Sequence, residues 1–199
     1  MARRAAVQFV ILAVAALGLA ACPPVTTKTP IGTTVKATTD PGLAGVWRGR
    51  IGKSKAFSYF SFLPQKDGTT TGVLVTAPSA EDEGGWGAFT LQTVALGPNH
   101  FINARETIDE GKPATGSMAD NIVPVLYHMA GYDMLTLSVI DEDAAKNAIK
   151  AGKIAGTIEA GQFGDVVLTA PPGDLDKFMA GAAGRALFPK PLVILHRLK

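Results

Sequence analysis

The chain has 199 residues, a formal net charge of +2 and a single cysteine, and 47% of its residues are hydrophobic. One cysteine excludes an intramolecular disulfide. The sequence holds no basic cluster interleaved with aromatic residues, so no nucleic-acid partner is predicted. The length suffices for one hydrophobic core of ordinary size.

The first 21 residues have the order of an export signal. Arg3 and Arg4 supply a positive start, and the stretch from Val7 to Leu19 is apolar except for one glutamine and one glycine. This apolar stretch of about 13 residues is shorter than the roughly 20 that a helix needs to cross a bilayer. The pattern is therefore typical of a cleaved signal peptide over residues 1–21 rather than of a spanning anchor.

Small residues lead from the apolar stretch into the cysteine, as Leu19, Ala20, Ala21 and Cys22. This junction resembles the lipobox of bacterial lipoproteins, which reads Leu, Ala or Ser, Gly or Ala, and then Cys. The resemblance implies that a diacylglycerol is attached to the Cys22 thiol and that the chain is cut just before this residue. An ordinary signal peptide followed by an incidental cysteine is the alternative.

Lipid on Cys22 predicts a membrane as partner, because two or more acyl chains give stable anchoring without a spanning helix. Pro23 stands where lipoproteins retained at an inner membrane carry aspartate. In a two-membrane cell the resemblance therefore implies an outer-membrane anchor facing the periplasm. Cleavage would remove Arg3 and Arg4 and bring the formal net charge to zero. The positive net charge of the whole chain is therefore no reason to predict a nucleic-acid partner.

Residues 22–42 are rich in threonine and proline and hold few large apolar side chains. Such a composition buries too little surface to offset chain entropy, so we predict a lipidated N-terminus followed by a flexible tether. The flexible-coil estimate gives the tether an end-to-end distance of about 25 Å. An ordered edge segment packed on the domain is the alternative.

Residues 43–199 are predicted to form a single β-rich domain. Runs of β-branched and aromatic residues alternate with turn signals, and residues 144–151 and 175–183 predict two short helices that end at glycine. We expect a mainly β fold, with a single antiparallel, strongly curved or barrel-like sheet of about ten strands. An open α+β sheet is the alternative. The predicted strands span residues 45–52, 56–63, 72–77, 86–96, 100–105, 122–129, 133–140, 154–159, 165–169 and 192–198.

The two ends of this domain carry a tryptophan and an arginine that invite comparison with a known family. The run Gly45-Val46-Trp47 lies in the first predicted strand and Arg197 lies in the last. This resembles the lipocalin and fatty-acid-binding-protein superfamily, where a Gly-x-Trp in the first strand meets an arginine from near the end of the chain. The resemblance implies a lipocalin-like barrel in which Arg197 packs over Trp47 as a closure pair, a contact worth roughly 0.5–2 kcal/mol. The domain is also similar to small bacterial lipoproteins of unknown function, although the helix at 144–151 departs from a plain lipocalin.

The chain lacks the spacings that catalysis or metal binding would need. The run Gly52-Lys53-Ser54 ends like a phosphate-binding loop, but Trp47 stands where the motif needs its first glycine. His100, His128 and His196 have no metal-ligand spacing. No catalytic residue, metal or cofactor is therefore predicted, and we expect the protein not to be an enzyme.

Aromatic residues on several predicted strands indicate what the sheet encloses. Trp86, Phe101, Phe89 and Tyr59 are the candidate lining of a small apolar cavity, open at one end of the curved sheet. Packing of a solid core is the alternative use of these side chains. The function expected first is a non-catalytic binding module for an apolar small molecule or a partner protein of the envelope. The alternative is a structural or assembly lipoprotein that acts through its surface.

Overall fold

The computed structural model describes residues 24–33, 35, 40–80, 83–160 and 164–199. The predicted signal peptide lies outside these residues, and so do Leu19, Ala20, Ala21 and Cys22. In the described part of the chain, every helix is too short or too polar to cross a membrane.

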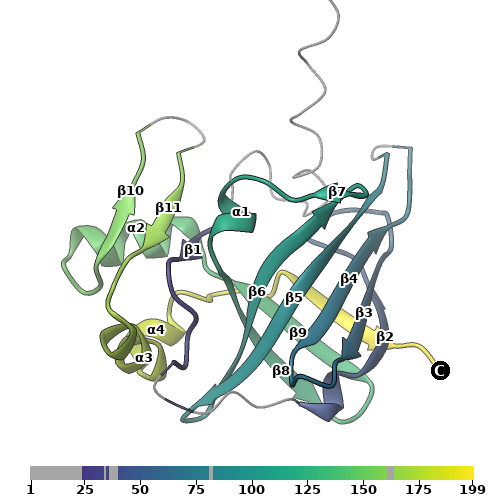
Figure 1. The fold of residues 1–199 in the computed structure, drawn as a ribbon, viewed down its shortest axis with the longest axis horizontal. Coiled ribbons are helices and arrows are strands. Elements are labelled where there is room, and N and C mark those ends of the chain that lie inside the picture. Colours follow the sequence, from purple (N-terminus) through teal and green to yellow (C-terminus); the bar gives the residue numbers. More distant parts are fainter. Residues whose placement is uncertain (1–23, 34, 36–39, 81–82, 161–163) are drawn as a thin grey trace, which may run out of the picture.

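Eight antiparallel strands close into a barrel (Figure 1). The order around the barrel is β5-β4-β3-β2-β12-β9-β8-β6, and pairing of β5 with β6 closes the ring. The last strand, β12, lies between β2 and β9, so the two ends of the domain meet in the wall. The expected mainly β, barrel-like fold is confirmed. The barrel strands are β2 (Gly45–Gly49), β3 (Ser58–Pro64), β4 (Thr70–Thr76), β5 (Gly85–Leu96), β6 (Asn99–Asp109), β8 (Val123–Ala130), β9 (Met134–Val139) and β12 (Val193–Arg197).

Successive side chains of each strand point alternately into the barrel and out of it. One wall therefore contacts both the barrel interior and the outside. In β3, Phe60 and Phe62 belong to the barrel interior, whereas Tyr59, which precedes Phe60, pairs with the outward residues of both neighbouring strands. The register of β5 shifts between Ala88 and Phe89. Such a bulge bends and twists a strand, which helps the long β5 to follow the curvature of the barrel.

Short elements lie at the two ends of the barrel. The 3₁₀ turn η2 (Pro41–Leu43) covers one end and places Leu43 in the interior cluster. Helix α1 (Ser117–Asp120) lies at the other end, next to the two-residue strand β7 (Lys112–Pro113) that pairs with β6. The barrel therefore has one end covered by η2 and an opposite end bordered by α1.

A satellite unit packs against one side of the barrel (Figure 1, left). It comprises α2 (Glu142–Lys150), β10 (Gly156–Ile158), β11 (Val166–Leu168), α3 (Pro172–Ala180) and α4 (Ala182–Arg185). Two of the strands that were expected in the single sheet are not part of the barrel. These strands, β10 and β11, form a second sheet with β1 (Thr26–Thr27). Each of these strands is only two or three residues long, and α2 has already carried the chain away from the barrel wall.

The described residues form two hydrophobic clusters, one on each side of the barrel wall. The interior cluster includes Trp47, Leu91 and Leu135. The second cluster lies between the outer face of β5, β6 and β8 and the satellite, and it includes Phe101 and Met179. A continuous strand such as β6 therefore buries both of its faces, which accounts for the apolar residues at consecutive positions in its sequence.

The N-terminal segment 24–33 is packed between the barrel and the satellite. Val25 and Ile31 are buried, and β1 pairs in parallel with β11. The Asn103 amide accepts from the backbone N–H of Ile31 and donates to the carbonyl of the same residue, both at 2.8 Å. Gly32 has a φ of +83°, and a Cβ there would lie 2.2 Å from a methyl carbon of Val94.

The expectation of a flexible tether over residues 22–42 is therefore wrong for residues 24–33. Composition suggested solvated coil, but threonine is β-branched and suits a strand. The apolar side chains within the threonine tract are enough to fill the seam between the two units. The alternative of an ordered segment packed on the domain describes this part of the chain.

Candidate ligand cavity

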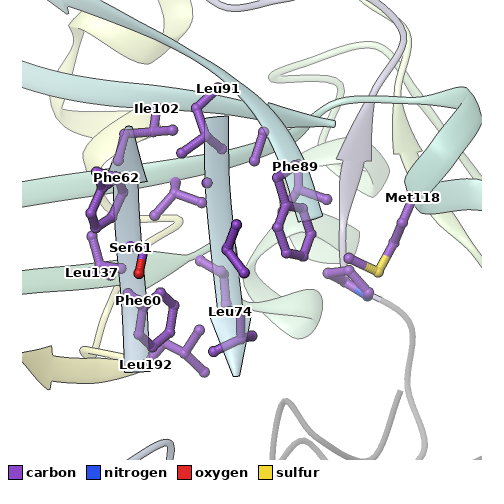
Figure 2. Close-up of a pocket in the computed structure, with 17 residues that line it drawn as sticks. Phe60, Ser61, Phe62, Leu74, Phe89, Leu91, Ile102, Met118, Leu137 and Leu192 are labelled. Atoms are coloured by element: carbon purple, nitrogen blue, oxygen red, sulfur yellow. The ribbon is translucent and has the colours of Figure 1, made fainter. Parts of the chain in front are cut away.

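The barrel encloses an apolar cavity of about 100 Å³ (Figure 2). Its wall combines inward side chains from β3, β4, β5, β6, β8 and β9, and serine is the one polar residue type among the described residues that line it. Gly72 of β4 makes room for Leu91, because a Cβ at this position would lie 2.6 Å from the Leu91 Cδ1 atom. Prominent lining residues are Phe60, Phe62, Leu74, Phe89, Leu91, Ile102 and Leu137.

Three residues from outside the regular strands complete the lining at the end bordered by α1. Met118 comes from α1, Leu192 precedes β12, and Pro24 begins the packed N-terminal segment. Figure 2 shows Met118 beyond Phe89, apart from the strand residues. We call this the open end of the barrel, since irregular chain rather than a paired strand forms the boundary there.

The opposite end is closed around Trp47, which is fully buried. The Trp47 indole N–H donates to the Leu43 carbonyl at 2.8 Å, and the guanidinium carbon of Arg197 lies 4.1 Å from the centroid of the Trp47 ring. Arg197 also donates to the carbonyls of Gly42 and Ala44, and so ties η2 to the last strand. The structure thus brings together the two residues that the sequence proposed as a barrel closure pair.

A partly buried polar contact supports the same closed end. The Tyr127 hydroxyl donates to Asp40 at 2.8 Å, and Asp40 in turn caps η2 by accepting from the Gly42 N–H at 2.8 Å. Burial of the phenol raises the pKa of Tyr127, and the hydrogen bond and charge of Asp40 raise it further. Tyr127 is therefore held in its neutral, donating form throughout the physiological range.

Of the four aromatic residues proposed as cavity lining, one lies in the lining and the other three face away from the barrel interior. Phe89 lines the cavity. Phe101 is buried on the outer side of the wall, where its ring centroid lies 5.8 Å from that of Phe188 in the satellite. Tyr59 pairs with the exposed residues Arg48 and Val75 on the outer face. Trp86 is 41% exposed near the open end of β5.

Sequence reasoning missed much of the lining, for two different reasons. Leu74, Ile102 and Leu137 are ordinary aliphatic strand residues, and only the parity of each strand could have assigned them to the interior. Met118 and Pro24 lie outside the barrel strands, so their sequence context carried no signal. In each case the residue reaches the cavity only because the barrel closes and places separate strands around one axis.

A carboxylate lies on the cavity face beyond the lining residues. Glu106 is opposite Phe89 in the register of β5 and β6, and it follows the inward residues Ile102 and Ala104 at intervals of two. Half-burial raises the pKa of Glu106, and the negative charge of Asp109 raises it further. The folded protein thus binds a proton at Glu106 more tightly than the unfolded chain does.

The tighter proton binding of the folded state predicts that the effect of Glu106→Gln on stability depends on pH. Below the ordinary carboxyl pKa of 4.5, both states are protonated and the substitution changes little. As pH rises through the pKa of the folded state, wild type loses the stability that the tighter proton binding supplied. The variant should therefore melt at a higher temperature than wild type at pH 7, and at nearly the same temperature at pH 4. Thermal denaturation followed by circular dichroism measures both values.

The exposed Glu159→Gln provides a control, since Glu159 lies outside the barrel. It should leave the melting temperature unchanged at both pH values. An equal shift at pH 4 and pH 7 for Glu106→Gln would contradict the proposed role of the buried charge.

The three histidines do not converge. His100, His128 and His196 are all exposed, and His100 makes an edge contact with Tyr127 at a centroid distance of 5.6 Å. Among the described residues, no group of three or more His, Cys, Asp or Glu side chains could hold a metal ion. The arrangement of the interior therefore supports apolar contacts, with Glu106 as a titratable group on the cavity face.

The fold and the cavity define a closed eight-stranded antiparallel barrel with an apolar interior and a packed satellite. The chain matches no protein-family model, no curated protein and no solved structure.

Proposed function

We propose that this chain is a lipid-anchored protein of the cell envelope whose barrel is a non-catalytic module that binds an apolar small molecule. The observation that carries the proposal is the apolar cavity inside the closed barrel. Buried apolar surface with few polar groups is the usual chemistry of small-molecule pockets. The Trp47–Arg197 contact at the covered end agrees with the lipocalin resemblance of the sequence.

The cavity volume limits the size of the ligand. A dry, apolar cavity of about 150 Å³ accommodates benzene or xenon, and the cavity here is about 100 Å³. It accommodates a short alkyl segment or a comparably small apolar group without rearrangement. A longer ligand would extend past Met118 and Pro24 at the open end, where the lining is not built from paired strands.

Ligand binding is tested with the processed chain purified from its own host and examined by native mass spectrometry. We expect an added mass that is lost on denaturation. Ala104 lines the cavity, so Ala104→Leu should fill the space and remove the added mass. Ala95→Leu adds the same group at an exposed position of β5 and should retain it.

A xenon titration followed by NMR tests the empty space directly. Wild type and Ala95→Leu should show interior chemical-shift changes that Ala104→Leu lacks. A chain without added mass and without xenon response would contradict ligand binding.

A surface role is the second candidate, and one observation favours it. Large apolar side chains are exposed on the outer face of β12, β2 and β4 and at the start of β5, on the side of the barrel that Figure 1 shows away from the satellite. Exposed apolar patches mark interaction surfaces. An empty cavity in the experiments above would favour this structural or assembly role. The exposed residues on these strands are Val46, Val75, Trp86 and Ile194.

A further inference from the structure

A groove of about 480 Å³ lies on the outer face of the barrel, along the pairing of β2 with β12. Arg48 and Arg50 line it, and His196 lies directly opposite Arg48 in the register. The described residues that line the groove include no aspartate or glutamate. The groove is therefore a positively charged depression on a wall that the satellite leaves uncovered.

The two arginines are held close together by one aromatic ring. The guanidinium carbons of Arg48 and Arg50 lie 4.7 Å and 4.0 Å from the centroid of Phe57. The Arg50 Nε–H also donates to the Lys55 carbonyl at 3.2 Å, which fixes the plane of its guanidinium. Two like charges that contact the same ring repel each other, and an anion bound by both would offset the repulsion. Guanidinium groups match the oxygens of a phosphate with paired hydrogen bonds.

The rest of the groove is apolar and adjoins the open end of the barrel. Ile194 is 48% exposed in the groove, beside Val193. Leu192 lines both the groove and the interior cavity. A molecule that carries a phosphate next to an apolar portion satisfies both halves of the groove, whereas free phosphate satisfies only the cationic half.

We propose that this groove binds the phosphate of an anionic phospholipid headgroup. The inference rests on the anchoring part of the proposed function, because Pro24 lines the open end and is two residues from Cys22. Two residues span at most about 7 Å. Lipid on Cys22 would hold the open end against the membrane surface, with Arg48 and Arg50 at the adjoining wall.

The test uses residues 22–199 with Cys22→Ser, which contain both hydrophobic clusters but carry no lipid. Circular dichroism first establishes that each variant is folded. Binding is measured by co-sedimentation with phosphatidylcholine vesicles, with or without an equal part of phosphatidylglycerol. We expect binding only to the anionic vesicles. The Arg48→Gln, Arg50→Gln pair should weaken that binding roughly 30-fold, at about fivefold for each basic residue near an anionic surface.

Matched variants separate the groove from general charge. Lys177→Gln with Arg185→Gln removes the same charge from exposed positions of α3 and α4, and should change binding less than about threefold. Arg48→Lys with Arg50→Lys keeps the charge without the planar donor groups and should give an intermediate loss. Equal losses in the glutamine pair and its control would overturn the proposal, as would absence of binding to anionic vesicles.

Inorganic phosphate distinguishes a lipid headgroup from a free anion. A rise in melting temperature with phosphate, without binding to anionic vesicles, would assign the groove to a small soluble anion and overturn the headgroup assignment. The cavity is tested independently, because the Arg48→Gln, Arg50→Gln pair should keep the added mass in native mass spectrometry. Ala104→Leu should lose that mass and still bind anionic vesicles.

Discussion

Trp47→Ala should lower the free energy of unfolding by about 3–5 kcal/mol, the range measured for truncating a buried aromatic side chain. The indole is fully buried in the interior cluster, donates to the Leu43 carbonyl and lies under the Arg197 guanidinium. Truncation removes these contacts together and leaves a cavity at the covered end. Urea denaturation followed by circular dichroism gives the free energy.

The second tryptophan of the chain provides the matched control. Trp86→Ala deletes the same side chain from a position that is 41% exposed. It should therefore lower the free energy of unfolding by less than about 1 kcal/mol. Trp47→Phe keeps an aromatic ring under Arg197 but loses the indole hydrogen bond, and an intermediate loss is expected. Equal costs for Trp47→Ala and Trp86→Ala would show that the covered end is not a principal source of stability.

Cys22→Ser should abolish acylation completely, because Cys22 is the only cysteine and the lipobox resemblance assigns the lipid to its thiol. Growth of the host with a clickable palmitate analogue should label wild type and leave the variant unlabelled. The variant should also accumulate as a precursor that is longer by residues 1–21. Mass spectrometry of the purified chain measures both the acyl mass and the position of the N-terminus.

Ala21→Gly provides the control for processing. Glycine is accepted before the cysteine in the lipobox pattern, so this variant should be labelled and cut like wild type. Label on the Cys22→Ser chain, or an unlabelled wild type with a free thiol at its N-terminus, would contradict the proposed lipid anchor.

Much of the barrel was predictable because its strands appear in the sequence as short alternating runs between turn signals. Alternation in Ser58–Pro64, with a turn ending at Gly68, specifies β3 and β4 with little help from the rest of the chain. The pairing of Trp47 with Arg197 could also be predicted, because the sequence shows a tryptophan two residues after a glycine and an arginine near the end of the chain. Local order and a recognisable pair were therefore enough to predict a strongly curved or barrel-like sheet, whereas its closure became visible only in the structure.

The residues of the candidate site depended on information that no single strand carries. Phe89 and Phe101 look alike in sequence, yet one lines the cavity and the other packs on Phe188 in the satellite. A wall with apolar groups on both faces gives no local indication of which face is inside. The satellite also explains the N-terminal segment, because the seam that buries Val25 and Ile31 exists only after both units are present.

The packed N-terminal segment has a consequence for the order of events in export. Pro24 is already part of the folded barrel, so the proposed cut before Cys22 is only two residues from closed structure. Peptidases cut preferentially in exposed chain or in locally opened states. Lipid attachment and cleavage would therefore precede docking of β1, and the last step of folding would take place on a chain that is already held at the membrane.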